Sequence, residues 1–211
     1  AMSAGEEINP VLVIEPTTTA WMYNTEAMND PQLGRIGETF QKLVTDLSKA
    51  QVEYDIGSED ILARHGSVNG KMLTIGRRRY GIVVLPPFTE NLNVKTMELL
   101  EQYVKVGGQV FCCGEPPTLV EGRPSDRGAA VARSGNWHRI EAAALPGTLS
   151  DMTGRDFRVT RTPGDQGILF HHRRQLADGQ LVFLANTSLS SPTAGTLEGL
   201  AGGVERWDPD T

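Results

Sequence analysis

The chain begins with a short apolar segment that is followed by a longer helical pattern. Residues 11–14 are four aliphatic residues without polar alternation, which predicts a strand covered on both faces, as in a parallel sheet. Residues 16–33 are polar and contain aromatic side chains, and we expect them to form a long loop. Apolar residues then recur at helical spacing and predict an amphipathic helix; they are Ile36, Phe40, Leu43, Val44, Leu47 and Ala50.

Strand and helix patterns continue to alternate as far as residue 114. Ser58 can cap a short helix, and a second amphipathic helix is expected between Asn93 and Gly107, with Val94, Met97 and Leu100 facing inward. This alternation indicates βαβ units with right-handed crossovers. The predicted fold class is therefore α/β with a mostly parallel sheet. The further strands are expected at residues 52–55, 72–75, 80–85 and 109–113.

The pattern changes after Gly114. Residues 115–136 are rich in Pro, Gly, Arg and Ser and predict a loop with one helical turn at 129–133. Asp178-Gly179 is a hairpin signal, so the C-terminal strands are expected to be antiparallel, either extending the first sheet or starting a β-sandwich. We divide the chain into a disordered or tag-derived segment 1–10, an α/β domain 11–155 and C-terminal strands 156–211. Those strands are expected at residues 157–160, 167–172, 180–185 and 203–207.

Composition narrows the function classes. The net charge of −6 argues against a nucleic-acid partner, because phosphate binding needs a basic face. No apolar run reaches the length of about 18 residues that a membrane span needs, and the first ten residues lack the pattern of a signal peptide. Adjacent cysteines rarely pair, so Cys112 and Cys113 predict no disulfide.

Four residues are candidates for ligand binding. In open parallel sheets, ligands bind beyond the carboxyl ends of the strands. Glu15 and Trp21 follow the first predicted strand, Asp55 ends the second, and Glu115 follows the strand after Gly107-Gly108. Glu15 together with Asp55 or Glu115 could form a carboxylate pair for acid–base chemistry. The alternative is that these carboxylates cap helices or pair with arginines, which is the commoner role.

Cys113 is the alternative nucleophile. A catalytic thiol needs a base and a lowered pKa, but the spacing of the histidines places none of them beside Cys113, and small buried cysteines are common in cores. Adjacent His171 and His172 must face opposite sides of a strand, one packed and the other exposed. No ligand spacing predicts a metal site, and no glycine motif predicts a phosphate site. We therefore expect no cofactor.

One segment carries a resemblance to a known family. Residues 99–111 contain Tyr103-Val104, then Gly107-Gly108, then a strand, and this segment resembles class I glutamine-amidotransferase-like domains, which include the trimerisation domains of certain β-galactosidases. The resemblance implies a flavodoxin-like three-layer sandwich. Cys113 lies close to the position of the family's nucleophile. However, the Gly-x-Cys-x-Gly elbow and the His-x-Glu partner are missing, so amidotransferase activity is not expected.

A second resemblance concerns large bacterial glycosidases of the α-L-rhamnosidase type. Residues 11–22, 54–62 and 203–211 resemble non-catalytic segments of such proteins. The resemblance implies a fragment of a glycoside hydrolase that acts as a scaffolding, oligomerising or cleft-shaping domain, with the catalytic acid and base on another domain. Its partners would be the other domains of the parent protein, a carbohydrate near Trp21 and Tyr23, or a second copy of the chain. The resemblance also implies that the parent protein is secreted or periplasmic, while the sequence of this chain does not indicate a location.

Two further function classes remain open. One is a small hydrolase that uses Cys113 or a carboxylate pair. The other is a carbohydrate-binding module, although an aromatic content of 6% argues against a large stacking platform.

Overall fold

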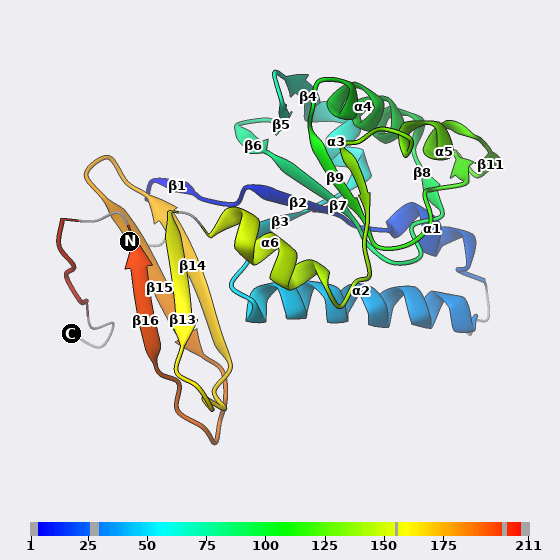
Figure 1. Cartoon of the computed structure of the whole chain (residues 1–211). Coiled ribbons are helices and arrows are strands. Elements are labelled where there is room, and N and C mark those ends of the chain that lie inside the picture. Colours follow the sequence, from blue (N-terminus) through cyan, green and yellow to red (C-terminus); the bar gives the residue numbers. More distant parts are fainter. Residues whose placement is uncertain (1–3, 26–29, 155, 200–201, 208–211) are drawn as a thin grey trace.

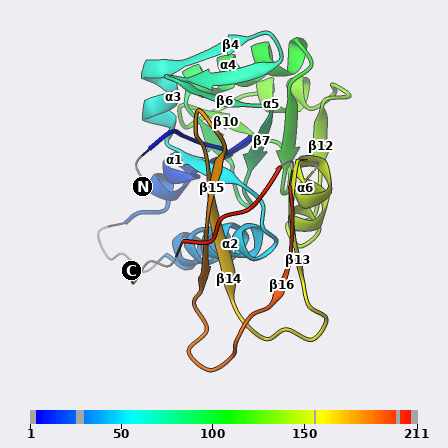
Figure 2. The same cartoon turned by 90° about the vertical axis from the view of Figure 1, so that its left-hand side faces the viewer.

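A computed structural model describes residues 4–25, 30–154, 156–199 and 202–207. An α/β unit is followed by a separate, elongated set of antiparallel strands that extends beyond it (Figures 1 and 2). The predicted boundary between the two at residue 155 falls outside the described residues, so that division stays a prediction.

The α/β unit is built on a five-stranded sheet in which every pairing is parallel. Its order, β12-β9-β7-β2-β3, places β2, the first of these five strands along the chain, between β3 and β7, the second and the third. The order therefore reverses beside β2, which makes the carboxyl ends of β2 and β7 a topological switch point. The α/β prediction is confirmed. The strands are β2 (Val11–Ile14), β3 (Tyr54–Gly57), β7 (Ile82–Leu85), β9 (Gln109–Cys112) and β12 (Trp137–Arg139).

Helices pack against both faces of this sheet (Figure 1). Successive strand residues point to opposite faces, so Val11 and Val13 contribute to one core while Leu12 and Ile14 contribute to the other. The first core is covered by α2 (Pro31–Lys49) and α6 (Leu145–Thr153), and the second by α3 (Glu59–His65) and α4 (Val94–Lys105). No helix in the described part of the chain is both long and apolar enough to cross a bilayer.

The predicted helices α2 and α4 are confirmed with small differences. The apolar stripe of α2 is buried at Ile36, Leu43 and Leu47. The helix starts at Pro31 because the Asp30 side chain accepts the N–H of Gln32 at 2.8 Å. In α4, Val94 is 41% exposed, contrary to expectation, since it is the first helical residue and lies at the free end of the helix.

Two local predictions are wrong. The expected loop 16–33 contains the helix α1 (Thr17–Met22). The expected strand 80–85 is interrupted at Gly81, so that β6 (Arg78–Tyr80) belongs to a different, antiparallel sheet. That sheet also contains β4 (Gly66–Asn69) and β5 (Met72–Ile75), the latter at the predicted position. The region after β9 holds the expected helical turn as α5 (Arg127–Val131) and the short strands β10 (Leu119–Val120) and β11 (Arg123–Pro124). Strand β10 also pairs with β8 (Asn91–Leu92), which precedes α4.

The C-terminal strands are antiparallel, as predicted, and form sheets of their own. One sheet contains β1 (Glu6–Glu7), β14 (Leu169–Gln175) and β15 (Gln180–Asn186), and the other contains β13 (Phe157–Arg161) and β16 (Gly195–Gly199). The predicted hairpin is confirmed by a 2.8 Å bond from the N–H of Leu176 to the carbonyl of Gly179.

Two predictions for the ends of the chain are wrong. Residues 6–7, expected to be disordered, form β1 because they pair with β14. Residues 203–207, expected to form a strand, are irregular and exposed, and β13 pairs with 195–199 instead.

Candidate functional site

The crevice at the switch point is occupied by side chains of the chain itself. Thr19 of α1 is fully buried, and its Oγ1 accepts the N–H groups of Glu90 at 3.1 Å and Asn91 at 3.0 Å. The same hydroxyl donates to the Asn91 carbonyl at 3.2 Å. These bonds tie α1 to the loop that follows β7. The place where a doubly wound sheet usually binds its ligand is therefore closed by internal hydrogen bonds.

A buried carboxylate completes this closure. Glu59, in the first turn of α3, is 3% exposed. Its Oε1 accepts the hydroxyl of Thr18 at 2.5 Å, and its Oε2 accepts the N–H of Asn93 at 2.7 Å. Sequence reasoning missed this network. The run Thr17-Thr18-Thr19 directly after a buried strand was the available signal, because hydroxyls at such a position can satisfy neighbouring backbone groups.

Three of the four predicted ligand residues follow strand ends, and each has different surroundings. The N–H of Glu15 bonds to the carbonyl of Gly57 at 3.0 Å. Trp21 is 68% exposed at the end of α1. Glu115 is exposed and ion-paired with Arg139 of β12, an arginine pairing of the kind expected for a structural carboxylate. Among the described residues no hydrogen bond joins Glu15 to Glu115.

Asp55 lies elsewhere. It is the second residue of β3, opposite Leu12, and not the residue after the strand. The expectation is wrong because Val52 closes the C-terminus of α2 through a 3.0 Å bond to Leu47, which delays the strand by two residues. Asp55 Oδ2 instead accepts from Arg78 at 3.0 and 3.1 Å and from the Tyr80 hydroxyl at 2.7 Å. The structure does not bring Asp55 together with Glu15 or Glu115.

The thiols of the two adjacent cysteines point into opposite cores. Cys112 packs with the α3 and α4 side and Cys113 with the α2 and α6 side; they are 1% and 7% exposed. Burial raises the pKa of Cys113 to about 12, with a smaller contribution from the charge of Glu141. Burial also raises the pKa of Cys112 to about 12. No histidine of the described chain hydrogen-bonds to either sulfur, and both thiols are protonated at neutral pH.

A second polar cluster joins the α/β unit to the C-terminal strands. Arg173 of β14 is 6% exposed, and its Nε and Nη2 donate to the two carboxylate oxygens of Glu53 at 2.7 and 2.6 Å. His171 Nε2 lies 3.3 Å from Glu53 Oε1, and its Nδ1 lies 2.8 Å from Gln51 Oε1. The guanidinium of Arg173 also lies 4.7 Å from the ring centre of Phe157. This cluster fixes the position of β14 against the end of α2.

The electrostatics of this cluster depend on Glu53. Burial by itself raises the pKa of Glu53, but the hydrogen bonds from His171 and Arg173 outweigh burial and lower the pKa below its usual value. The His171 side chain is 3% exposed and that of His172 33% exposed, which confirms the predicted difference between the two imidazoles.

A cleft of about 370 Å³ lies beside this cluster, between β3 and β14. Its walls combine polar and apolar side chains from segments that are far apart in the sequence. Sequence reasoning did not find it, because only the docking of β14 beside β3 creates it. The lining residues are Glu7, Asn9, Ser48, Val52, Glu53, Tyr54, Asp55, Ile56, Phe170, His171, His172 and Arg173.

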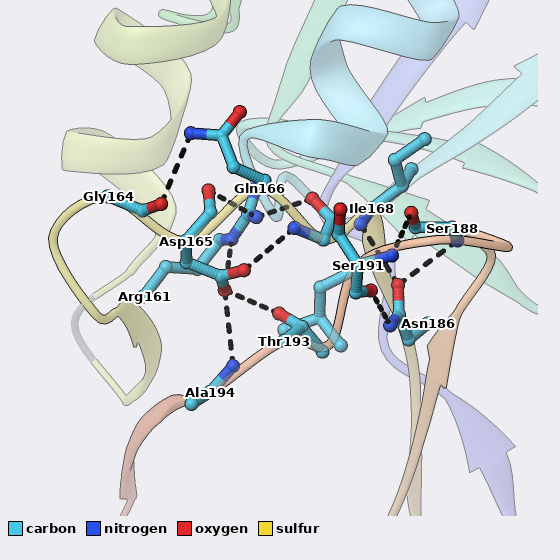
Figure 3. Close-up of polar contacts among 12 residues, drawn as sticks. Arg161, Gly164, Asp165, Gln166, Ile168, Asn186, Ser188, Ser191, Thr193 and Ala194 are labelled. Atoms are coloured by element: carbon cyan, nitrogen blue, oxygen red, sulfur yellow. Dashed lines mark hydrogen bonds and ion pairs between the residues drawn. The ribbon is translucent and has the colours of Figure 1, made fainter.

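The loops at the far end of the C-terminal strands are held by a polar network that is structural in character (Figure 3). Asp165 Oδ2 accepts from Arg161 at 3.1 Å, Thr193 at 2.5 Å and the N–H of Ala194 at 3.2 Å. The hydrogen bonds from Arg161 and Thr193 lower the pKa of Asp165. The Asn186 side chain likewise stabilises the loop that follows β15, because its amide N–H donates to the Ser191 carbonyl at 2.8 Å. Within the described residues no group of three His, Cys, Asp or Glu side chains is arranged to hold a metal.

The chain resembles known proteins in structure, but the sequence comparisons found no match. No family model and no curated protein matches the sequence. A rhamnosidase from Novosphingobium sp. PP1Y matches with a TM-score of 0.54 and 18% identity, over 88% of this chain and 18% of that chain. An apo exo-carrageenase GH42 from Bacteroides ovatus matches with a TM-score of 0.48 and 10% identity, over 90% of this chain and 28% of that chain.

The TM-score of the rhamnosidase match shows a shared fold, whereas the TM-score of the exo-carrageenase match is too low to show one. The chain spans less than a third of the length of each of these glycoside hydrolases, so it resembles a part of such a protein.

Proposed function

We propose that this chain is a non-catalytic accessory domain of a larger glycoside hydrolase, where it supports the parent protein or shapes its cleft. The single observation that carries the proposal is the closed switch point. Thr18, Thr19 and Glu59 fill the crevice where a ligand of a doubly wound sheet would bind. The fold likeness to part of a rhamnosidase supports a role inside a longer chain.

The finer fold assignment belongs to the same proposal. We assign the α/β unit to the flavodoxin-like, glutamine-amidotransferase-like three-layer class. The strand order, with β2 between β3 and β7, matches the flavodoxin-like order of doubly wound sheets. Helices on both faces also agree with three layers.

The geometry argues against the two catalytic alternatives. A cysteine hydrolase needs a thiolate at the rim beside a base, whereas Cys113 is buried and its pKa is raised. A carboxylate pair needs two acidic groups facing one substrate, whereas Glu115 is engaged by Arg139. Neither arrangement supplies an activated group.

Exposed apolar side chains favour contact with other domains or with a second copy of the chain. Phe183 and Leu184 of β15 are 46% and 41% exposed, and Leu197 of β16 is 46% exposed. Trp21 adds an exposed indole on α1. Phe183 and Leu184 are adjacent in β15 and face opposite sides of the strand. Apolar groups on both sides of this strand are therefore open to contact with another domain.

The test separates the accessory role from catalysis. We expect the isolated chain to leave aryl α-L-rhamnosides, aryl β-galactosides and glutamine unhydrolysed. In the complete polypeptide encoded by the full reading frame, we expect glycosidase activity that the substitutions Cys113→Ala and Glu115→Gln leave unchanged. Turnover by the isolated chain that is lost in Cys113→Ala would overturn the proposal, as would a reading frame that encodes no further domain.

A further inference from the structure

The cleft between β3 and β14 has the size and the mixed walls of a small-ligand site. Its volume of about 370 Å³ falls in the lower part of the range of a few hundred to a thousand Å³ typical of such sites. One part of the wall is apolar and includes Tyr54, Ile56 and Phe170. Ile56 is 50% exposed, so the cleft is open to solvent on this side.

The charged groups of the cleft are ion-paired with one another. Arg78 contacts Asp55 at 3.0 Å and Glu7 at 3.4 Å, and Arg173 contacts Glu53 at 2.6 Å. Glu7 and Asp55 share Arg78, so three carboxylates face two arginines. This excess of negative charge disfavours an anionic ligand, and the ion pairs hold the wall in a fixed shape.

Two polar atoms of the wall keep unused hydrogen-bonding capacity. Asn9 donates its amide N–H to Asp55 at 2.5 Å, and its amide oxygen has no hydrogen bond among the described residues. His172 directs Nδ1 to Glu7 at 3.2 Å, and its Nε2 likewise has no partner there. An amide oxygen accepts, while an imidazole nitrogen accepts or donates according to its protonation. A hydroxyl group, which does both, complements this pair.

We propose that this cleft binds one neutral sugar residue. Its hydroxyls bond to Asn9 and His172, and its C–H face packs against Ile56 and Phe170. This site is distinct from the strand-end crevice, and it deepens the proposed accessory role by giving the domain a carbohydrate contact of its own. The proposal of a sugar site rests on the proposed function only in the choice of sugars, among molecules that carry several hydroxyl groups, as the ligands to test.

The experiment is a titration of the isotopically labelled chain, followed by amide NMR, with methyl glycosides of galactose, glucose, mannose and rhamnose. Galacturonate serves as the charged comparison. We expect saturable shifts confined to residues 52–56 and 170–173, in the millimolar range that a single sugar residue reaches on a small open site, and weaker binding of galacturonate. Ile56→Ala, which shortens the apolar face without removing a hydrogen bond, should raise the Kd by about threefold or more.

Two controls make the outcome decisive. Trp21→Ala removes the exposed indole on α1, outside the cleft, and should leave binding unchanged. The thermal unfolding of each variant is checked against that of the parent chain. Absence of saturable binding by any neutral sugar overturns the proposal, and so do shifts centred on Trp21 that disappear in Trp21→Ala. His172→Ala should weaken binding as well, and equal binding in that variant contradicts the assigned hydrogen bond. The accessory role is tested separately by activity, so it survives a failure of the cleft to bind.

Discussion

Replacing Arg173 by methionine should destabilise the chain far more than replacing an exposed cation. Methionine keeps an unbranched apolar stem that can still contact Phe157, so the change removes chiefly the guanidinium and its two bonds to Glu53. Loss of one partner from a buried ion pair typically costs about 3–5 kcal/mol, because the other charge stays buried. His171 remains 3.3 Å from Glu53, and we therefore expect a loss near the lower limit, about 3 kcal/mol.

The assay is urea unfolding followed by circular dichroism, together with limited proteolysis of the C-terminal strands. The second readout is needed because the two units need not unfold in one step once the cluster between them is broken. The matched control is Lys42→Met, which breaks an ion pair on α2 whose lysine side chain is 73% exposed. Exposed pairs of this kind contribute about 0.3–0.5 kcal/mol.

A double-mutant cycle isolates the pair itself. Glu53→Gln combined with Arg173→Met should lose less stability than the sum of the single changes, with a coupling energy of about 2 kcal/mol. Additive losses, or an Arg173→Met loss no greater than that of Lys42→Met, would refute the reasoning that this pair joins the two units.

Three further predictions follow from single contacts. The pKa of Glu53 is lowered in the folded chain from an ordinary value of 4.5. The ionised carboxylate therefore stabilises the fold fully above pH 4.5, and this stabilisation is lost as the pH falls through the lowered pKa. Unfolding measured against pH should show this loss in the parent chain, and an equal loss in Glu53→Gln would contradict it. Thr19→Val leaves two backbone N–H groups without their acceptor and should cost about 2–3 kcal/mol in urea unfolding, whereas a loss below about 0.5 kcal/mol would mean that water replaces the hydroxyl. Gly108→Ala should destabilise, since its methyl group would lie 2.2 Å from the ring of Tyr103, while Gly37→Ala in α2 meets nothing within 4 Å and should gain about 0.5–1 kcal/mol; equal melting temperatures for the two variants would refute this contrast.

The local pattern of the sequence was enough for much of the α/β unit. Four consecutive aliphatic residues predicted β2, and the apolar stripe from Ile36 to Leu47 predicted α2. Both predictions succeed because burial on both faces or on one helical stripe leaves a periodic record in neighbouring residues. The same logic failed for residues 16–33, where α1 has no long stripe and is held by tertiary hydrogen bonds from Thr18 and Thr19.

The candidate sites were less accessible to sequence reasoning. Asp55 was assigned to the wrong end of its strand because a shift of two residues, set by the way α2 ends, cannot be read from the apolar pattern. The face of the sheet on which the Cys113 side chain lies is likewise not given by the sequence. Alternation along a strand shows that neighbouring side chains lie on opposite faces, but the packing of the helices decides which face is which.

The sequence by itself determined the class of fold and the order of the main elements of the α/β unit. Only the tertiary structure decided that the switch point is closed by Thr19 and Glu59, and that β14 lies beside β3 with Glu53 and Arg173 paired across the contact. The physical reason is range. Periodicity reports burial among residues a few positions apart. The network of Thr18 and Glu59 joins residues 41 positions apart and the Glu53–Arg173 pair joins residues 120 positions apart, so their contact is fixed by the packing of whole elements.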